Sequence, residues 1–137
     1  MMYALKLCTN GDISMIEVPE NKDWRWYSRQ IGCDLVEVVR PMGLESPRVL
    51  IVDEEGLLKK RPVINFLASW LYETHLHGNP ICGDCLVMEE YETADGLELG
   101  GMPKADTLKL ADEMKAHIWE AVNEIKKAMG ISLVRAE

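Results

Sequence analysis

The stretch Arg48-Val49-Leu50-Ile51-Val52-Asp53 decides the fold of this chain. Its four consecutive apolar residues, without alternation between apolar and polar positions, predict a strand that is buried on both faces. We expect this strand to be central in a sheet. A helix predicted over 66–73, which Asn65 caps, is expected to bury Trp70 against it.

Further strands are predicted on both sides of this stretch. Asn10-Gly11 favours a hairpin within Tyr3–Val18, because both residues tolerate a positive φ. Patterns rich in β-branched and apolar residues predict strands over 34–40 and 81–91. The segment 93–102 contains several turn-forming residues, and we expect it to be a mobile loop.

Residues 1–137 are expected to form a single domain, because no long linker divides them. Strands cluster without regular alternation with helices. The sequence therefore predicts an α+β fold, with a mixed or antiparallel sheet of about five strands and two or three helices packed on it. Asp23 is expected to cap one of these helices, over 24–31.

The C-terminal part of the chain is predicted to form a long helix within 103–130 and then a short edge strand over 131–134. Apolar residues recur at three- and four-residue spacing through Thr107–Met129. This stripe has two interpretations, and the sequence leaves both open. The helix covers the core of its own chain, or it pairs with a second copy in a homodimer.

Composition and charge narrow the classes of partner. The chain has 137 residues, 47% of them hydrophobic and 28% charged, which is typical of one globular domain, and its net charge is −8. Duplex DNA binding requires lysine and arginine contacts to phosphates, so we do not expect it. A protein partner fits better, with a basic surface as the candidate complement.

We also expect no contact with a membrane. No apolar run approaches the roughly 20 residues that a transmembrane helix needs. Residues 1–9 carry no secretory pattern, so we expect a cytoplasmic protein. Its cysteines are then free thiols, at Cys8, Cys33, Cys82 and Cys85.

Four segments together resemble a known family. They are Ile31–Val39, Val49–Lys59, Pro62–Ser69 and Ile81–Met88, and they occur in the order of the domain-of-unknown-function family 3846. The resemblance covers roughly 12–92 and implies a protein of a phage, plasmid or other mobile element. It carries over no activity and no catalytic residue. Cys82 and Cys85 stand where the family more often has apolar residues.

The candidate metal ligands are His75, His77, Cys82 and Cys85. Imidazole and thiolate are the groups that tetrahedral Zn²⁺ prefers. Against a zinc site, all four lie within 75–85, and two cysteines three apart on a strand point to opposite faces. The Cys-Gly-Asp-Cys sequence is also a weak candidate redox pair, but no positive charge flanks it to lower a thiol pKa.

Catalytic patterns are weak. Ser28, Ser69 and Cys33 lie in no nucleophile context, and the glycines at 96–101 lack the lysine and the strand-to-helix setting of a phosphate loop. We therefore do not expect an enzyme.

Trp24, Trp26 and Tyr27 are candidate interaction residues, since aromatics beside arginine are favoured at interfaces. The alternative interpretation places Trp24 and Tyr27 in the core, on one helix face, and leaves Trp26 half-exposed.

Two hypotheses on function follow from these observations. One is a phage or mobile-element accessory protein that acts by non-enzymatic binding to a host or element protein. The other is a zinc- or small-ligand-binding protein with its site near His75–Cys85.

Overall fold

The computed structural model describes residues 1–130, and every strand pairing in that range is antiparallel. Five strands lie in the order β2-β1-β5-β4-β3, while β6 pairs with β5 and β7 with β1. This confirms the predicted α+β class. The strands are β1 Met2–Leu7, β2 Ile13–Val18, β3 Val36–Val39, β4 Arg48–Asp53, β5 Cys85–Thr93, β6 Gly96–Gly100 and β7 Met102–Pro103.

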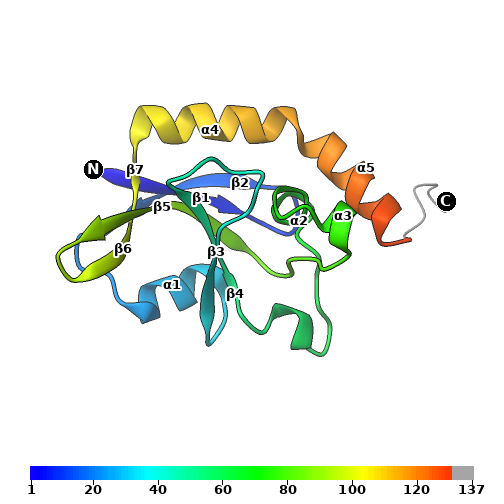
Figure 1. Cartoon of the computed structure of the whole chain (residues 1–137), viewed down its shortest axis with the longest axis horizontal. Helices are drawn as coiled ribbons and strands as arrows, with labels where there is room; N and C mark the ends of the chain where they lie inside the picture. Colours follow the sequence, from blue (N-terminus) through cyan, green and yellow to red (C-terminus); the bar gives the residue numbers. More distant parts are fainter. Residues whose placement is uncertain (131–137) are drawn as a thin grey trace.

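Helices cover both faces of the sheet (Figure 1). α1 packs on one face, over a core that includes Ile51 and Met88. α2, α4 and α5 lie on the other face, over a core that includes Leu50 and Val87. None of the helices within 1–130 combines the length and apolar character needed to cross a bilayer. The helices are α1 Trp24–Ile31, α2 Phe66–Leu71, α3 Thr74–His77, α4 Lys104–Ala116 and α5 Ile118–Ala128, with a 3-10 turn, η1, at Gly56–Leu58.

β4 is an interior strand, as its apolar run predicted. Its side chains alternate between the two cores, with Val49 and Ile51 on the α1 face and Leu50 and Val52 on the other. The middle position of the sheet belongs to β5, which pairs with β1, β4 and β6.

Trp70 is only half-buried, so its expected burial against β4 is wrong. α2 buries three apolar residues in the core, Leu67, Ala68 and Leu71. Trp70 lies at the edge of that core, where it stacks on His117. The short helix therefore uses its aliphatic residues, not its largest aromatic, to cover the sheet.

The segment 93–102 is not the mobile loop that we expected. It contains the turn after β5, the strand β6 and the start of β7. Gly96, at φ 113°, closes the turn between β5 and β6, and Thr93 Oγ1 donates a hydrogen bond to the carbonyl of Gly96 at 2.8 Å. A Cβ on Gly101 would lie 2.8 Å from the backbone nitrogen of Tyr3. Some of these glycines permit close packing within the sheet, so their number did not indicate mobility.

The expected C-terminal helix is divided at His117 into α4 and α5. α4 packs on β1 and β2, whereas α5 changes direction and packs on α2 and α3 (Figure 1). Much of the apolar stripe is buried inside this chain, which favours the interpretation of the helix as core cover. Its buried members are Ala111, Met114, Ala121 and Ile125, whereas Leu108, which the pattern also placed in the stripe, is exposed and Leu110 is buried instead. The strand expected over 131–134 lies outside the described residues.

Candidate functional site

A cleft of about 430 Å³ lies where three segments meet: the β1–β2 turn, the beginning of α2 and the side of α5. Most of its lining is apolar. The lining residues are Leu7, Cys8, Thr9, Asn10, Gly11, Asp12, Ile13, Phe66, Leu67, Ile118, Trp119, Val122 and Lys126.

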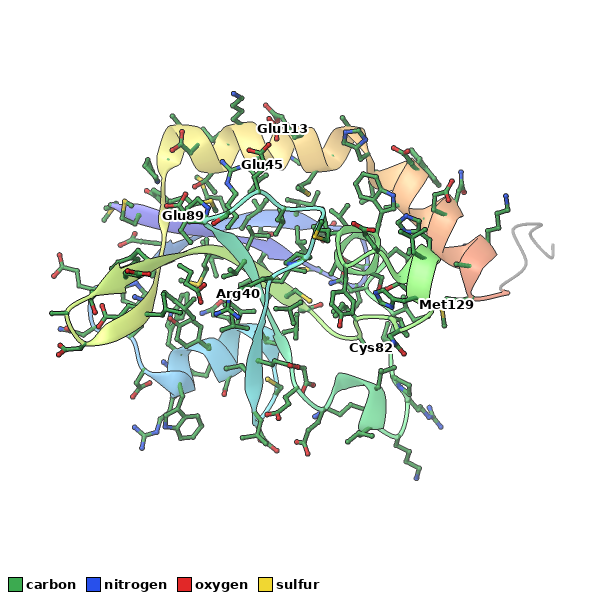
Figure 2. The ribbon with its side chains drawn as sticks, in the orientation of Figure 1. Arg40, Glu45, Cys82, Glu89, Glu113 and Met129 are labelled. Atoms are coloured by element: carbon green, nitrogen blue, oxygen red, sulfur yellow. The ribbon has the colours of Figure 1, made fainter. Side chains whose placement is uncertain are left out.

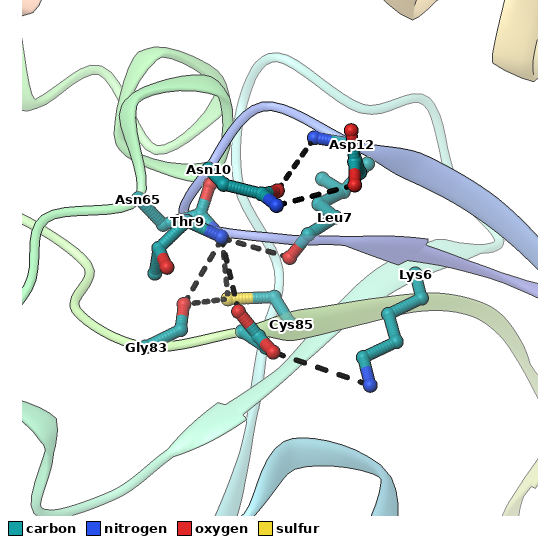
Figure 3. Close-up of polar contacts among 9 residues, drawn as sticks. Lys6, Leu7, Thr9, Asn10, Asp12, Asn65, Gly83 and Cys85 are labelled. Atoms are coloured by element: carbon teal, nitrogen blue, oxygen red, sulfur yellow. Dashed lines mark hydrogen bonds and ion pairs between the residues drawn. The ribbon is translucent and has the colours of Figure 1, made fainter.

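The first wall is the β1–β2 turn, which is held by hydrogen bonds at both of its ends (Figure 3). Asn10 Oδ1 accepts from the amide of Asp12 at 2.9 Å, and Gly11 supplies the positive φ that the tight turn requires. The amide of Thr9 donates to Asp84 Oδ1 at 3.0 Å, which ties the turn to the segment before β5. This wall is therefore preformed.

The second wall begins at Asn65, whose side chain is 1% exposed. Its Oδ1 accepts from the amide of Ala68 and so caps α2, as the sequence predicted. Its Nδ2 donates to the carbonyls of Leu7 at 2.9 Å and Gly83 at 3.0 Å. One buried amide thus fixes the start of α2 against the end of β1 and places Phe66 at the cleft.

The third wall is one side of α5, formed by residues four apart in sequence. Ile118 and Val122 are half-buried, and Lys126 Nζ lies 5.8 Å from the centre of the Phe66 ring. Trp119 stands at the rim and is 76% exposed. Within residues 1–130, Lys126 forms no ion pair, so its charge is free to meet a bound anion.

Cys8 is the cleft residue with the most reactive side-chain chemistry. Burial raises the pKa of its thiol, and the neighbouring Asp84 carboxylate raises it further. The thiol therefore stays protonated at neutral pH, and the cleft presents apolar surface, a neutral thiol, the ammonium group of Lys126 and, at the β1–β2 turn, the carboxylate of Asp12. This is the chemistry of binding by apolar contact and a single ion pair.

The structure does not bring the four candidate metal ligands together. Among the described residues, no group of three histidine, cysteine, aspartate or glutamate side chains could hold a metal ion. Both ring nitrogens of His77 are hydrogen-bonded, to the carbonyl of Tyr72 at 2.8 Å and to the amide of Asn79 at 3.1 Å.

The remaining three candidates lie in different surroundings. Cys85 is fully buried in the core, and burial raises the pKa of its thiol far above the ordinary value. Cys82, which precedes the strand, has a thiol pKa raised by burial and by Asp53. His75 is half-buried, and its Nδ1 has no hydrogen-bond partner in the described part of the chain.

The core interpretation of the aromatic group on α1 is wrong, because Trp26 and not Trp24 is the buried tryptophan. Trp26 is the core residue, 9% exposed, and its ring forms a T-shaped pair with the Tyr27 ring, with 5.2 Å between centroids. Trp24 is 60% exposed, with the Arg25 guanidinium 5.3 Å from its ring centre. The buried face of α1 runs through Trp26 and Ile31, and Trp24 at the first helical position falls outside it.

Sequence patterns alone did not indicate the cleft, because its walls come from segments far apart in the chain. The available signal was Trp119, a large aromatic that stands beside the buried stripe of Ala121 and Ile125 instead of within it.

The comparisons with known proteins give one match. A family model with the description "Domain of unknown function (DUF3846)" matches residues 2–113, from the first strand into α4. No curated protein and no solved structure matches the chain. The match takes in the whole sheet and two of the three cleft walls, but α5 lies beyond it.

Proposed function

The chain belongs to the family "Domain of unknown function (DUF3846)", and from the cleft on this fold we propose that it acts by non-enzymatic binding of a protein partner. The observation that carries the proposal is Trp119, 76% exposed at the rim of a mostly apolar cleft. Tryptophan is enriched among the residues that dominate binding energy at interfaces.

The cleft also supports a partner of defined chemistry. Ile118, Val122 and Phe66 offer an apolar surface for an aliphatic or aromatic side chain, and Lys126 lies beside them. An acidic group next to the inserted side chain would pair with Lys126. The partner is therefore a protein segment in which an apolar residue neighbours a carboxylate.

A biological setting is supported by the resemblance over roughly 12–92. The resembling proteins occur in phages, plasmids and other mobile elements. We place this chain among accessory proteins of such an element, with a host or element protein as its partner.

The test compares two exposed tryptophans. The wild-type chain is immobilised, and captured proteins are purified and titrated against Trp119→Ser, with Trp24→Ser as the matched control on the opposite face of the sheet. We expect the Trp119 variant to lose at least about tenfold in affinity, which is within the range for an interface tryptophan. The Trp24 variant should bind like the wild type.

Cys8 provides an independent measurement, because it lines the cleft and is half-buried. A partner seated in the cleft should slow alkylation of Cys8 and leave Cys33, on the α1 side of the sheet, at its free rate. A partner that binds both tryptophan variants equally, or that leaves Cys8 alkylation unchanged, would overturn the proposal.

A further inference from the structure

Two exposed surfaces of opposite charge lie apart from the cleft. We define the basic loop as residues 57–63, Leu-Leu-Lys-Lys-Arg-Pro-Val. We define the acidic hairpin as residues 89–100, which comprise the second half of β5, its turn and β6. Both surfaces also expose apolar side chains.

The basic loop is held firmly at its base. A Cβ on Gly56 would lie 2.6 Å from the carbonyl oxygen of Cys82, so the chain there is in close backbone contact. The amide of Gly83 donates to the carbonyl of Val63 at 2.9 Å, and Ile64 forms a β-bridge with Cys82. The loop projects beyond the labelled Cys82 in Figure 2, away from the sheet.

The tip of this loop has charge and apolar surface that its own chain does not use. Leu58 is 79% exposed, and Lys60 and Arg61 are exposed beside it. Lys59 pairs with Asp53 at 3.5 Å, whereas neither Lys60 nor Arg61 pairs with a carboxylate in the described range. These cations stand out on a chain whose net charge is −8.

The acidic hairpin has the complementary chemistry. Glu90 at its base is neutralised by Arg40, but Glu92 and Glu98 are exposed and have no cationic partner among residues 1–130. Leu97 is exposed close to them, as is Tyr91, whose hydroxyl bonds to Glu98 at 3.4 Å. By the pairing register, Glu92 lies beside Leu97 on one face of the hairpin and Glu98 lies beside Tyr91 on the other. Each face thus presents a carboxylate next to an apolar side chain, and the loop presents cations next to Leu58.

The two surfaces cannot meet within one molecule, because β5 separates them. The loop packs against residues 82–83, just before β5 begins, and the hairpin turn follows the end of β5. The nine residues of β5 span roughly 30 Å at about 3.3 Å per residue. In Figure 1 the β5–β6 turn lies at the left end of the molecule, whereas the η1 loop lies at the bottom, right of centre.

We propose that the basic loop of one chain docks on the acidic hairpin of a second copy. Such a contact is heterologous, because it uses two different surfaces, and it leaves a free loop and a free hairpin at the two ends of each pair. Repetition of the contact therefore gives head-to-tail chains or rings. Exposed leucines on both sides exclude water from the ion pairs, which strengthens the pairs.

Sedimentation velocity of the full chain tests the proposal over a protein concentration series. At about 0.02 M salt, where charges are poorly screened, we expect the average mass to reach at least about twice the monomer mass. At about 0.5 M salt the mass should fall to that of the monomer. A mass that stays monomeric at every protein concentration in low salt overturns the proposal.

Charge-swapped variants test which surfaces are in contact. Lys60→Glu/Arg61→Glu should be monomeric, and so should Glu92→Lys/Glu98→Lys. An equimolar mixture of the two should associate again, because each loop then meets a hairpin of opposite charge. Lys104→Glu/Lys109→Glu on α4 changes the net charge as much as the loop variant does, and it should still associate.

A different partner of the basic loop would give different results. If the wild-type chain stays monomeric but its loop binds anionic vesicles or single-stranded nucleic acid, the proposal is wrong and the loop has another partner. If the two charge-swapped variants do not associate when mixed, although circular dichroism shows both folded, the head-to-tail contact is also wrong.

Discussion

The imidazole of His117 stacks on the indole of Trp70, with 5.3 Å between the ring centroids and 27° between the ring planes. His117 is the residue at which α4 ends and α5 begins, and Trp70 lies on α2. The stacked pair therefore fixes the change of helix direction against the helix that forms the second wall of the cleft.

Replacing this histidine tests how much the stacking stabilises the domain. We expect His117→Ala to lower the free energy of unfolding by about 1 kcal/mol, the size measured for aromatic pairs. Lys115→Ala, an exposed change two residues earlier, is the control and should cost less than about 0.5 kcal/mol. Urea unfolding followed by circular dichroism measures both, and equal values would show that the stacking contributes nothing.

Asn65 is the polar side chain with the largest predicted effect on stability. Asn65→Ala removes the α2 cap and leaves the carbonyls of Leu7 and Gly83 without their amide donor. We expect a loss of about 3 kcal/mol, since each buried unsatisfied group costs about 1–3 kcal/mol. Asn123→Ala, at an exposed helical position, should change stability by less than about 0.5 kcal/mol. Chemical denaturation that gives both variants the same midpoint contradicts the assigned role.

Two adjacent glycines provide a matched pair. A Cβ on Gly101 would press on the backbone of Tyr3, whereas one on Gly100 would meet only the Tyr91 ring, which can move. We expect Gly101→Ala to cost about 2–3 kcal/mol, as overpacking against fixed atoms does. Gly100→Ala should cost less than about 1 kcal/mol. Thermal unfolding ranks them, and the reverse order would show that the β1–β7 contact is looser than described.

The buried thiol of Cys85 should lower the free energy of unfolding at alkaline pH. Burial raises the pKa of its thiol in the folded chain, so the unfolded chain loses this proton first, near the ordinary value of 9.0. The contribution of this thiol to the free energy of unfolding is fully present below that pH. Above it, the contribution decreases by about 1.4 kcal/mol per pH unit. Tyr27, whose pKa burial raises from 10.0 to about 12, adds a second decline above pH 10.

The interval between pH 9 and pH 10 therefore reports on the thiols, of which Cys85 is the most deeply buried. Cys85→Ala should unfold more easily at pH 7, because it leaves a small cavity, but its stability should decline less steeply across this interval. Cys8→Ala is the control, because Cys8 is only half-buried and its removal should leave the decline close to that of the wild type. Urea titrations at several pH values give the slopes, and parallel slopes for all three proteins would contradict the prediction.

Local rules account for the parts of the fold that sequence predicted well. The strands, the Asn10-Gly11 turn and the caps at Asp23 and Asn65 each depend on neighbouring residues, and all are present. The buried face of α1 could not be predicted in the same way. With aromatics at three of its first four positions, the side that packs is decided by the sheet beneath it.

In the C-terminal half, too, local sequence rules did not predict the structure. Glycines in 93–102 suit a loop and a hairpin equally, and only pairing with the distant Met2 and Tyr3 selects the strand β7. The break at His117 depends on the separate surfaces that α4 and α5 cover. The cleft could not be predicted for the same reason, since its three walls are brought together only by the complete fold.

β1 pairs with β2, β5 and β7, so one of its partners is its neighbour in sequence and the other two are synthesised much later. Leu5 and Leu7 can be covered only after β5, β7 and α4 have been synthesised. At 5–20 residues per second, this delay is on the order of ten seconds. Until then the β1–β2 hairpin presents apolar side chains and an open strand edge, so it is the segment on which nascent-chain chaperones would act.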